Sequence, residues 1–353
     1  AFRGFGAPQT QFAVECHMDR IAAELGLDPL ELRRRNAVKV GDVTPTGQTL
    51  RESVGAHECL DRTAKLSGYA EKRARYTREN AAAEKAERAG KVAFGTRGAN
   101  KSARRVRRGI GLALAYHGAG FTGSGETRLG SVAALDLTPE GRPRALAAST
   151  EIGQGTQTVF AQMVAEGLGV SPGLVLVQNP DTLEVPNSGP TVASRTVMIV
   201  GGLLRRCGQL MRERLELFAE RPMRDDADFR AVAKKFLKQR GPLRTEQKYE
   251  TPGWIQWDDD HYRGDAYPVF SYGALAVEVE VDLDTGETQV LNVVTAQDIG
   301  KAIHPVLAAG QIEGGTFYEG AGCVDCNNSG YRGRQGVYEV MPISSSLRDL
   351  VLE

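Results

Sequence analysis

The sequence has no long apolar run, no excess of one charge and few cysteines. It contains no stretch of about 18 apolar residues, so it predicts no membrane-spanning helix. Its 44 basic and 44 acidic residues balance, so no overall charge points to nucleic acid or to a membrane surface as a partner. The five cysteines are an odd number, which fits a reducing compartment better than a disulfide framework. We therefore expect a cytoplasmic protein.

Glycine, in contrast, is abundant. The 41 glycines in 353 residues exceed the average frequency of about 7%, whereas proline occurs only 15 times. The glycines follow no three-residue period, which excludes collagen, and 41% apolar residues suffice for a buried core. Excess glycine in such a composition indicates many tight turns, or backbone that approaches a ligand closely.

Hydrophobic periodicity predicts an α/β (α+β) fold of two packed subdomains, with mixed sheets, β-hairpins and long helices. The predicted helices span residues 9–25, 30–36, 156–168 and 192–218. The predicted hairpins pair residues 131–137 with 144–148 and residues 274–281 with 290–294. A charged, alanine-rich stretch over residues 71–108 is expected to form an exposed helix and a linker; a nucleic-acid arm is the alternative. The predicted regions are 1–108, 109–315 and 316–353.

Three glycine-rich loops are each followed by a predicted helix. They are AFRGFGAPQ at 1–9, EIGQGT at 151–156 and PNSGPTVAS at 186–194. Each would place free backbone N–H groups, small residues and hydroxyl or amide side chains at a helix N-terminus, where anions bind. One such loop is typical of ordinary helix capping. Three in one chain favour a large cofactor that is polyanionic or forms many hydrogen bonds.

Neither of the common nucleotide-binding motifs is present. The sequence has no Walker loop, because Gly90-Lys91 and Gly300-Lys301 are not followed by Ser or Thr. Gly4-Phe5-Gly6 lacks the third glycine and the preceding strand of a dinucleotide fingerprint. The expected cofactor is therefore neither a P-loop nucleotide nor a dinucleotide in a Rossmann crevice.

The three loops and three further blocks resemble the molybdenum-binding subunit of the xanthine dehydrogenase and aldehyde oxidase family. The further blocks are FSYGALAVEVEVD, DIGKAIHP and GQIEGG, between residues 270 and 315. The resemblance implies a molybdopterin cofactor and hydroxylation of an aldehyde, purine or N-heteroaromatic carbon with water as the oxygen source. It also implies partner subunits or domains with 2Fe-2S centres and FAD, because nothing in this chain can hold a four-cysteine cluster.

The same resemblance assigns roles to individual residues. The cofactor-binding residues would be Arg3, Gly4, Phe5, Gly6, Gly153, Gln154, Gly155, Thr191, Ala193 and Ser194. Phe5, Phe121 and Ala193 would line the pocket of a small-molecule substrate, where aromatic faces suit a flat ring. Ordinary core packing is the alternative for Phe5 and Phe121.

The resemblance to this family ends near Gly315. The glutamate that serves the family as a base lies in a Gly-Glu motif beyond this point, and no matching motif follows here, so we assign no catalytic residue. We expect that the part before Ala1 is missing as well, so export of the protein stays an alternative to a cytoplasmic location. We expect a fragment of a catalytic subunit that is inactive alone.

Residues 316–353 resemble the C-terminal zinc-binding segment of type IV pilus assembly and type II secretion ATPases. Those proteins use two CxxC pairs, because tetrahedral zinc takes four ligands, whereas here only Cys323 and Cys326 form one pair. They would be half of a zinc site, with free thiols as the alternative.

The simplest interpretation of the whole chain is a molybdenum-subunit fragment joined to this tail. The alternatives are a secretion- or pilus-associated zinc or interaction module, and a nonfunctional chimeric fusion.

Overall fold

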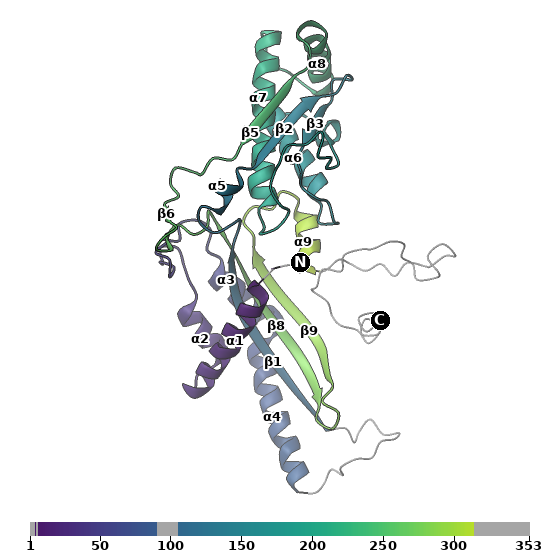
Figure 1. The fold of residues 1–353 in the computed structure, drawn as a ribbon. Helices are drawn as coiled ribbons and strands as arrows, with labels where there is room; N and C mark the ends of the chain where they lie inside the picture. Colours follow the sequence, from purple (N-terminus) through teal and green to yellow (C-terminus); the bar gives the residue numbers. More distant parts are fainter. Residues whose placement is uncertain (1–3, 5, 90–104, 314–353) are drawn as a thin grey trace, which may run out of the picture.

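The chain forms two main β-sheets, each with an apolar core of its own. The computed structural model describes residues 4, 6–89 and 105–313. In Figure 1 the two sheets lie one above the other, and helices cover each of them. This arrangement confirms the predicted α/β fold with mixed sheets, hairpins and long helices.

The first sheet is antiparallel, with its strands in the order β1-β8-β9. The strands span Val106–Gly118 (β1), Phe270–Asp282 (β8) and Thr288–Asp298 (β9). Along β8, Ala274 and Ala276 are buried and alternate with less buried residues, so one face of the sheet lies against a core. The helices α3 (Ala56–Ser67) and α4 (Tyr69–Arg88) contribute Leu60 and other buried side chains to this core.

The second sheet is mixed and has the order β4-β3-β2-β5. Its strands span Val132–Leu137 (β2), Pro143–Leu146 (β3), Leu176–Val177 (β4) and Arg244–Lys248 (β5), and only the β3–β4 pair is parallel. The helices that pack on this sheet or beside it are α6 (Thr156–Leu168), α7 (Gly202–Ala219) and α8 (Asp226–Arg240). Its core includes Leu135, Phe160 and Leu203, which are at most 2% exposed.

The two N-terminal helices, α1 (Ala7–Glu24) and α2 (Pro29–Asn36), are attached to the first sheet through buried charge. Arg33 of α2 is 2% exposed and donates to the Glu15 carboxylate of α1 at 2.7 Å. Glu15 also accepts a hydrogen bond from the backbone N–H of Leu114 in β1 at 2.9 Å. One carboxylate therefore joins α1, α2 and β1.

Short elements complete the described chain. They are α5 (Gly125–Leu129), η2 (Pro172–Leu174), η3 (Thr196–Gly201), β6 (Trp257–Asp258), β7 (Arg263–Gly264) and α9 (Pro305–Glu313). Within residues 6–89 and 105–313, no helix is both long and apolar enough to cross a membrane.

Most predicted elements are confirmed. The helix predicted over residues 156–168 matches α6, and both predicted hairpins are present as β2–β3 and β8–β9. The helix predicted over residues 192–218 is partly wrong, because Ala193 and Ser194 have left-handed backbone that no α-helix accommodates. A π-helical turn, η3, precedes α7 instead. The divisions predicted at residues 108 and 315 stay predictions; the first lies within β1 and the second outside the described residues.

Three arginines near the end of the charged stretch pair within the molecule. Arg107 and Arg105 lie 2.9 and 3.4 Å from the Glu87 carboxylate at the end of α4. Arg108 of β1 pairs with Glu280 of β8 at 2.8 Å. These ion pairs tie α4 to the first sheet and connect its strands.

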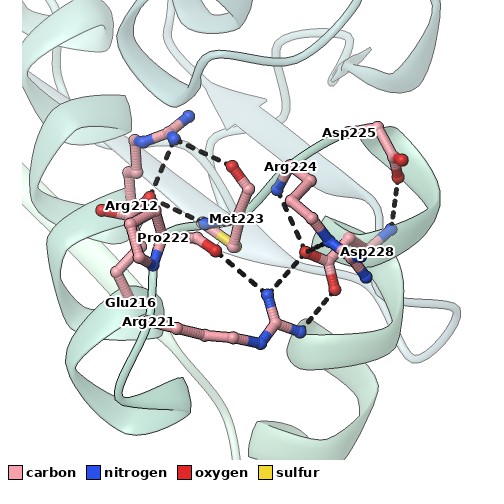
Figure 2. Close-up of polar contacts among 8 residues, drawn as sticks. All are labelled: Arg212, Glu216, Arg221, Pro222, Met223, Arg224, Asp225 and Asp228. Carbon is pink, nitrogen blue, oxygen red and sulfur yellow. Dashed lines mark hydrogen bonds and ion pairs between the residues drawn. The ribbon is translucent and has the colours of Figure 1, made fainter.

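The corner between α7 and α8 is organised around Asp228. Its carboxylate accepts hydrogen bonds from two nitrogens of the Arg221 guanidinium at 2.6 and 2.7 Å, and from the backbone N–H of Arg224 at 3.0 Å. Asp225 caps α8 by accepting from the backbone N–H of Asp228 at 2.9 Å. Figure 2 shows the Asp228 carboxylate surrounded by these donors. The Arg221 side chain holds the pKa of Asp228 well below its ordinary range.

Replacing Asp228 by Asn should lower the stability of the chain most strongly near neutral pH. The pKa of Asp228 is lower in the folded chain than in the unfolded chain. Its contribution to the free energy of unfolding is therefore present above the unfolded pKa of about 3.9 and is lost as the pH falls through the lower, folded pKa. The gap in urea midpoint between wild type and Asp228→Asn should thus be full at pH 7 and narrower, but still present, near pH 3, which lies below the unfolded pKa and above the folded one. Asp260→Asn, at an exposed aspartate, is the control. A gap that stays the same at both pH values would contradict this account.

Candidate functional site

The loop before α6 is folded around the carboxylate of Glu151. This group accepts hydrogen bonds from the backbone N–H groups of Gly153 at 2.8 Å, Gly155 at 3.1 Å and Gln157 at 3.0 Å. The expectation that these N–H groups are free is therefore wrong. Gly153 and Gly155 have φ values of +99° and +86°, which turn the loop back so that Glu151 can cap its own helix. Burial opposes ionisation of Glu151, but the three N–H groups outweigh it and lower the pKa.

The side chain of Gln154 is held within the same loop. Its Nε2 donates to the carbonyl of Thr150 and to the hydroxyl of Thr156, both at 2.7 Å. Its Oε1 accepts from the backbone N–H of Ile152 at 2.7 Å. An amide oxygen can accept a second hydrogen bond, so Oε1 is the atom of Gln154 that retains capacity for a ligand.

The loop over residues 186–195 runs beside the segment that leads into Glu151. The Thr191 hydroxyl accepts from the backbone N–H of Thr150 at 2.9 Å. The buried Ser188 hydroxyl accepts from the backbone N–H of Ala148 at 2.9 Å and donates to the carbonyl of Val132 at 2.8 Å. The structure thus brings together two of the three segments predicted to hold the cofactor.

Ala193 and Ser194 stand out by their backbone. Their φ values are +56° and +53°, a left-handed conformation that costs roughly 1–2 kcal/mol per residue with a Cβ. The π-helical turn η3 begins two residues after Ser194, and such turns are frequent at functional sites. Strained backbone persists only where the surrounding structure enforces it, which makes this segment a candidate binding site.

A buried ion pair between Arg195 and Glu126 lies directly behind this segment. The two side chains are 0% and 3% exposed, and their closest N–O distance is 2.9 Å. The sequence-based prediction missed both residues. The available signal was a single charge beside small or apolar residues: Glu126 follows Gly118–Gly125, and Arg195 precedes the largely apolar stretch 196–204.

Phe121 lies in the loop that leads to Glu126. It is half-buried, and its backbone N–H donates to the Glu126 carboxylate at 3.1 Å. The neighbouring N–H of Gly120 donates to the carbonyl of Ala193 at 2.7 Å. Phe121 therefore belongs to the loop that touches the predicted cofactor segment, and its place in a substrate pocket stays a prediction.

The N-terminal loop is described only in part. Gly4 has a φ of +88° and its carbonyl accepts from the backbone N–H of Ala7 at 2.9 Å, while the carbonyl of Gly6 accepts from the Thr10 hydroxyl at 3.2 Å. The other site residues predicted here and in the tail lie outside the described residues; they are Arg3, Phe5, Cys323 and Cys326. Within the described part of the chain, no group of three or more His, Cys, Asp or Glu side chains could hold a metal ion.

A hollow of about 180 Å³ lies away from these loops. Residues 48–54 line one wall, and Trp254, Asp265 and Phe270 are among the residues that line the rest. None of the residues predicted to bind the cofactor belongs to it. The loop surface is instead open, since Ile152, Gly153 and Ser194 are exposed. We therefore locate the candidate site on the loops and not in this hollow.

Comparison with known families gives two matches that together cover most of the chain. Both families are described as molybdopterin cofactor-binding domains; one matches residues 1–37 and the other residues 62–338. The second match includes the loops around Glu126, Glu151 and Arg195 and continues beyond residue 315.

Individual relatives are similar over nearly the whole chain. It is 32% identical to a probable xanthine dehydrogenase subunit of Bacillus subtilis, over 89% of this chain and 40% of the relative. It is 30% identical to the nicotinate hydroxylase of Emericella nidulans, over 91% of this chain and 22% of the relative. The solved aldehyde oxidoreductase of Desulfovibrio gigas matches with a TM-score of 0.67 and 29% identity, over 88% of this chain and 31% of that one. The chain thus spans about a fifth to two fifths of these relatives.

Replacing Glu151 by Gln should loosen the loop before α6. The variant loses the charge and one of the two acceptor oxygens, so we expect a local loss of about 1 kcal/mol, the usual scale for a lost helix cap. Amide hydrogen exchange at Gly153, Gly155 and Gln157 should become several-fold faster. Glu166→Gln, at an exposed position near the other end of α6, should leave these amides unchanged. Equal exchange rates in wild type and Glu151→Gln would refute the capping role.

Proposed function

Because this chain belongs to the molybdopterin cofactor-binding domain family, we propose that it forms the molybdopterin-binding part of a molybdenum hydroxylase. The substrate class would be an aldehyde, a purine or an N-heteroaromatic compound, with water as the oxygen source. The observation that carries the proposal is the Thr150–Thr191 hydrogen bond, which places the two predicted cofactor segments side by side. The names of the relatives, a xanthine dehydrogenase subunit, a nicotinate hydroxylase and an aldehyde oxidoreductase, support the same class.

The residues of these loops fit a cofactor that is held by backbone and small polar groups. At Gly153, no described atom outside the glycine and its two chain neighbours lies within 4 Å of the place where a Cβ would stand, so a flat group could approach the backbone closely. The amide oxygen of Gln154 and the hydroxyl of Ser194 would contribute hydrogen bonds. When bound, molybdopterin would supply the redox-active molybdenum at which the substrate is oxidised.

The N-terminus of α6 is left out of the proposed anion-binding surface. The Glu151 carboxylate already occupies the N–H groups that an anion would need, and its negative charge would repel one. We assign to Glu151 the task of shaping the loop, so that Gly153 and Gln154 face the cofactor. The anionic part of molybdopterin would then lie toward Thr191 and Ser194.

The remaining roles belong to the larger assembly. Arg3, Gly4, Phe5 and Gly6 would complete the cofactor surface, and Phe5, Phe121 and Ala193 would contact the substrate. Partner subunits or domains with 2Fe-2S centres and FAD would carry the electrons away, in a cytoplasmic enzyme. Because the chain spans only part of its relatives, the hydroxylase reaction is proposed for the assembly and not for this chain alone.

A zinc-binding tail with Cys323 and Cys326 is the second candidate. The family match over residues 62–338 extends across both cysteines. It therefore favours one continuous family segment rather than a fragment joined to a second module. A single CxxC pair also supplies only two of the four ligands that structural zinc takes.

The content of bound metal and pterin tests the proposed function. The full chain, expressed in cells that make molybdopterin, should carry molybdenum and show pterin fluorescence after release of the cofactor. Gln154→Ala should lower both several-fold, because it removes the amide that organises the loop. Gln289→Ala, at an exposed position of β9, is the matched control and should leave them unchanged. Zinc without molybdenum would favour the tail as the functional module, and neither metal would favour a nonfunctional fusion.

A further inference from the structure

We infer that Arg195 and Glu126 are positioning residues for molybdopterin: their buried ion pair holds residues 191–194 in the conformation that receives the cofactor. The inference rests on the proposed function of these loops. Neither residue has a proposed contact with substrate or cofactor, so both would act through the backbone that they hold.

All five N–H donors of the Arg195 guanidinium have acceptors. Nε and one N–H of Nη2 donate to the Glu126 carboxylate at 2.9 to 3.0 Å, and the other N–H of Nη2 donates to the Ser131 hydroxyl at 2.5 Å. Nη1 donates to the carbonyls of Ser188 at 2.9 Å and Pro190 at 3.2 Å. The planar guanidinium thus fixes two carbonyls of the loop relative to the start of β2.

Glu126 also connects the ion pair to the loop that contains Gly120 and Phe121. Its Oε1 accepts from the backbone N–H of Phe121, and the adjacent N–H of Gly120 donates to the carbonyl of Ala193. The left-handed pair Ala193–Ser194 is therefore held on one side by the loop that Glu126 organises, and is followed directly by Arg195 itself. This enclosure explains how two strained residues persist in succession.

Gly189 shows how closely the loop packs on the guanidinium. A Cβ at this position would lie 3.0 Å from Nη1 of Arg195 and 3.0 Å from the Ser131 hydroxyl, and its φ is +76°. Only glycine fits such a backbone without displacing the ion pair. The loop and the pair are therefore fitted to one another.

Stability alone does not account for a charged pair at this place. A buried ion pair contributes little net stability compared with apolar side chains of similar volume, because both charges lose their hydration. What it does supply is geometry, since a guanidinium fork and a carboxylate accept few relative orientations. A site that must hold strained backbone in one conformation benefits from that constraint.

Three variants of the full chain separate positioning from simple stabilisation. Arg195→Lys and Glu126→Gln each break the fork, and the double variant Arg195→Met with Glu126→Leu replaces both charges by apolar side chains of similar size. We expect the double variant to be less destabilised than either single variant because it leaves no unpaired buried charge, although the carbonyls of Ser188 and Pro190 lose their donor. All three should nevertheless carry about tenfold less molybdopterin per chain, the scale seen when groups that orient ligands are lost.

A second readout does not depend on the cofactor. Amide hydrogen exchange over residues 189–194 should be faster in all three variants, while exchange within α8 stays as in wild type.

Asp228→Asn is the matched control, because it breaks a carboxylate–arginine contact far from the loops in sequence and should lower stability without lowering molybdopterin content.

Two outcomes would overturn the inference. One is a double variant that recovers both wild-type stability and wild-type molybdopterin content, which would make the pair merely structural. The other is a molybdopterin content that falls as far in Asp228→Asn as in Arg195→Lys. A wild-type chain that takes up no molybdopterin would refute the proposed function itself, and the inference with it, whatever the exchange data show.

Discussion

The ion pair of Arg195 and Glu126 is the constraint on which the geometry of the candidate site depends. It is fully buried, it uses every guanidinium donor, and it joins the start of β2 to two loops that are far apart in the chain. Together with the Gly120–Ala193 hydrogen bond, it holds Ala193 and Ser194 in left-handed conformations one after the other. The candidate site is thus a surface of hydrogen-bonded loops, which would suit a large ligand bound through many polar contacts.

Charge inside this site shapes the backbone. Glu151 occupies the N-terminus of α6 in the way an external anion would, and Thr191 then ties that loop to its neighbour. An anionic ligand would therefore be repelled from the N-terminus of α6. A single carboxylate has a similar role at Glu15, which joins α1 and α2 to strand β1 of the first sheet.

Local signals in the sequence predict most of the fold and the position of the loops. Asp28 before Pro29 marks the start of α2 because capping is a matter of a few adjacent residues, and the Asp28 carboxylate does accept from the backbone N–H of Leu30 at 2.8 Å. Gly153 and Gly155 mark a loop in the same way, because the backbone conformation of a turn also depends on a few adjacent residues. The pairing of Glu126 with Arg195 could not be predicted, because the two residues lie 69 positions apart and only the tertiary fold brings them together.

An experimental structure of the chain with molybdopterin bound tests the central claim most directly. The account predicts that the cofactor contacts both the 151–155 loop and residues 191–194, with Ala193 and Ser194 still left-handed and the Arg195–Glu126 pair intact. It also predicts that Glu151 keeps its three backbone hydrogen bonds. A cofactor bound away from both loops, or bound at the N-terminus of α6 with Glu151 displaced, would contradict it.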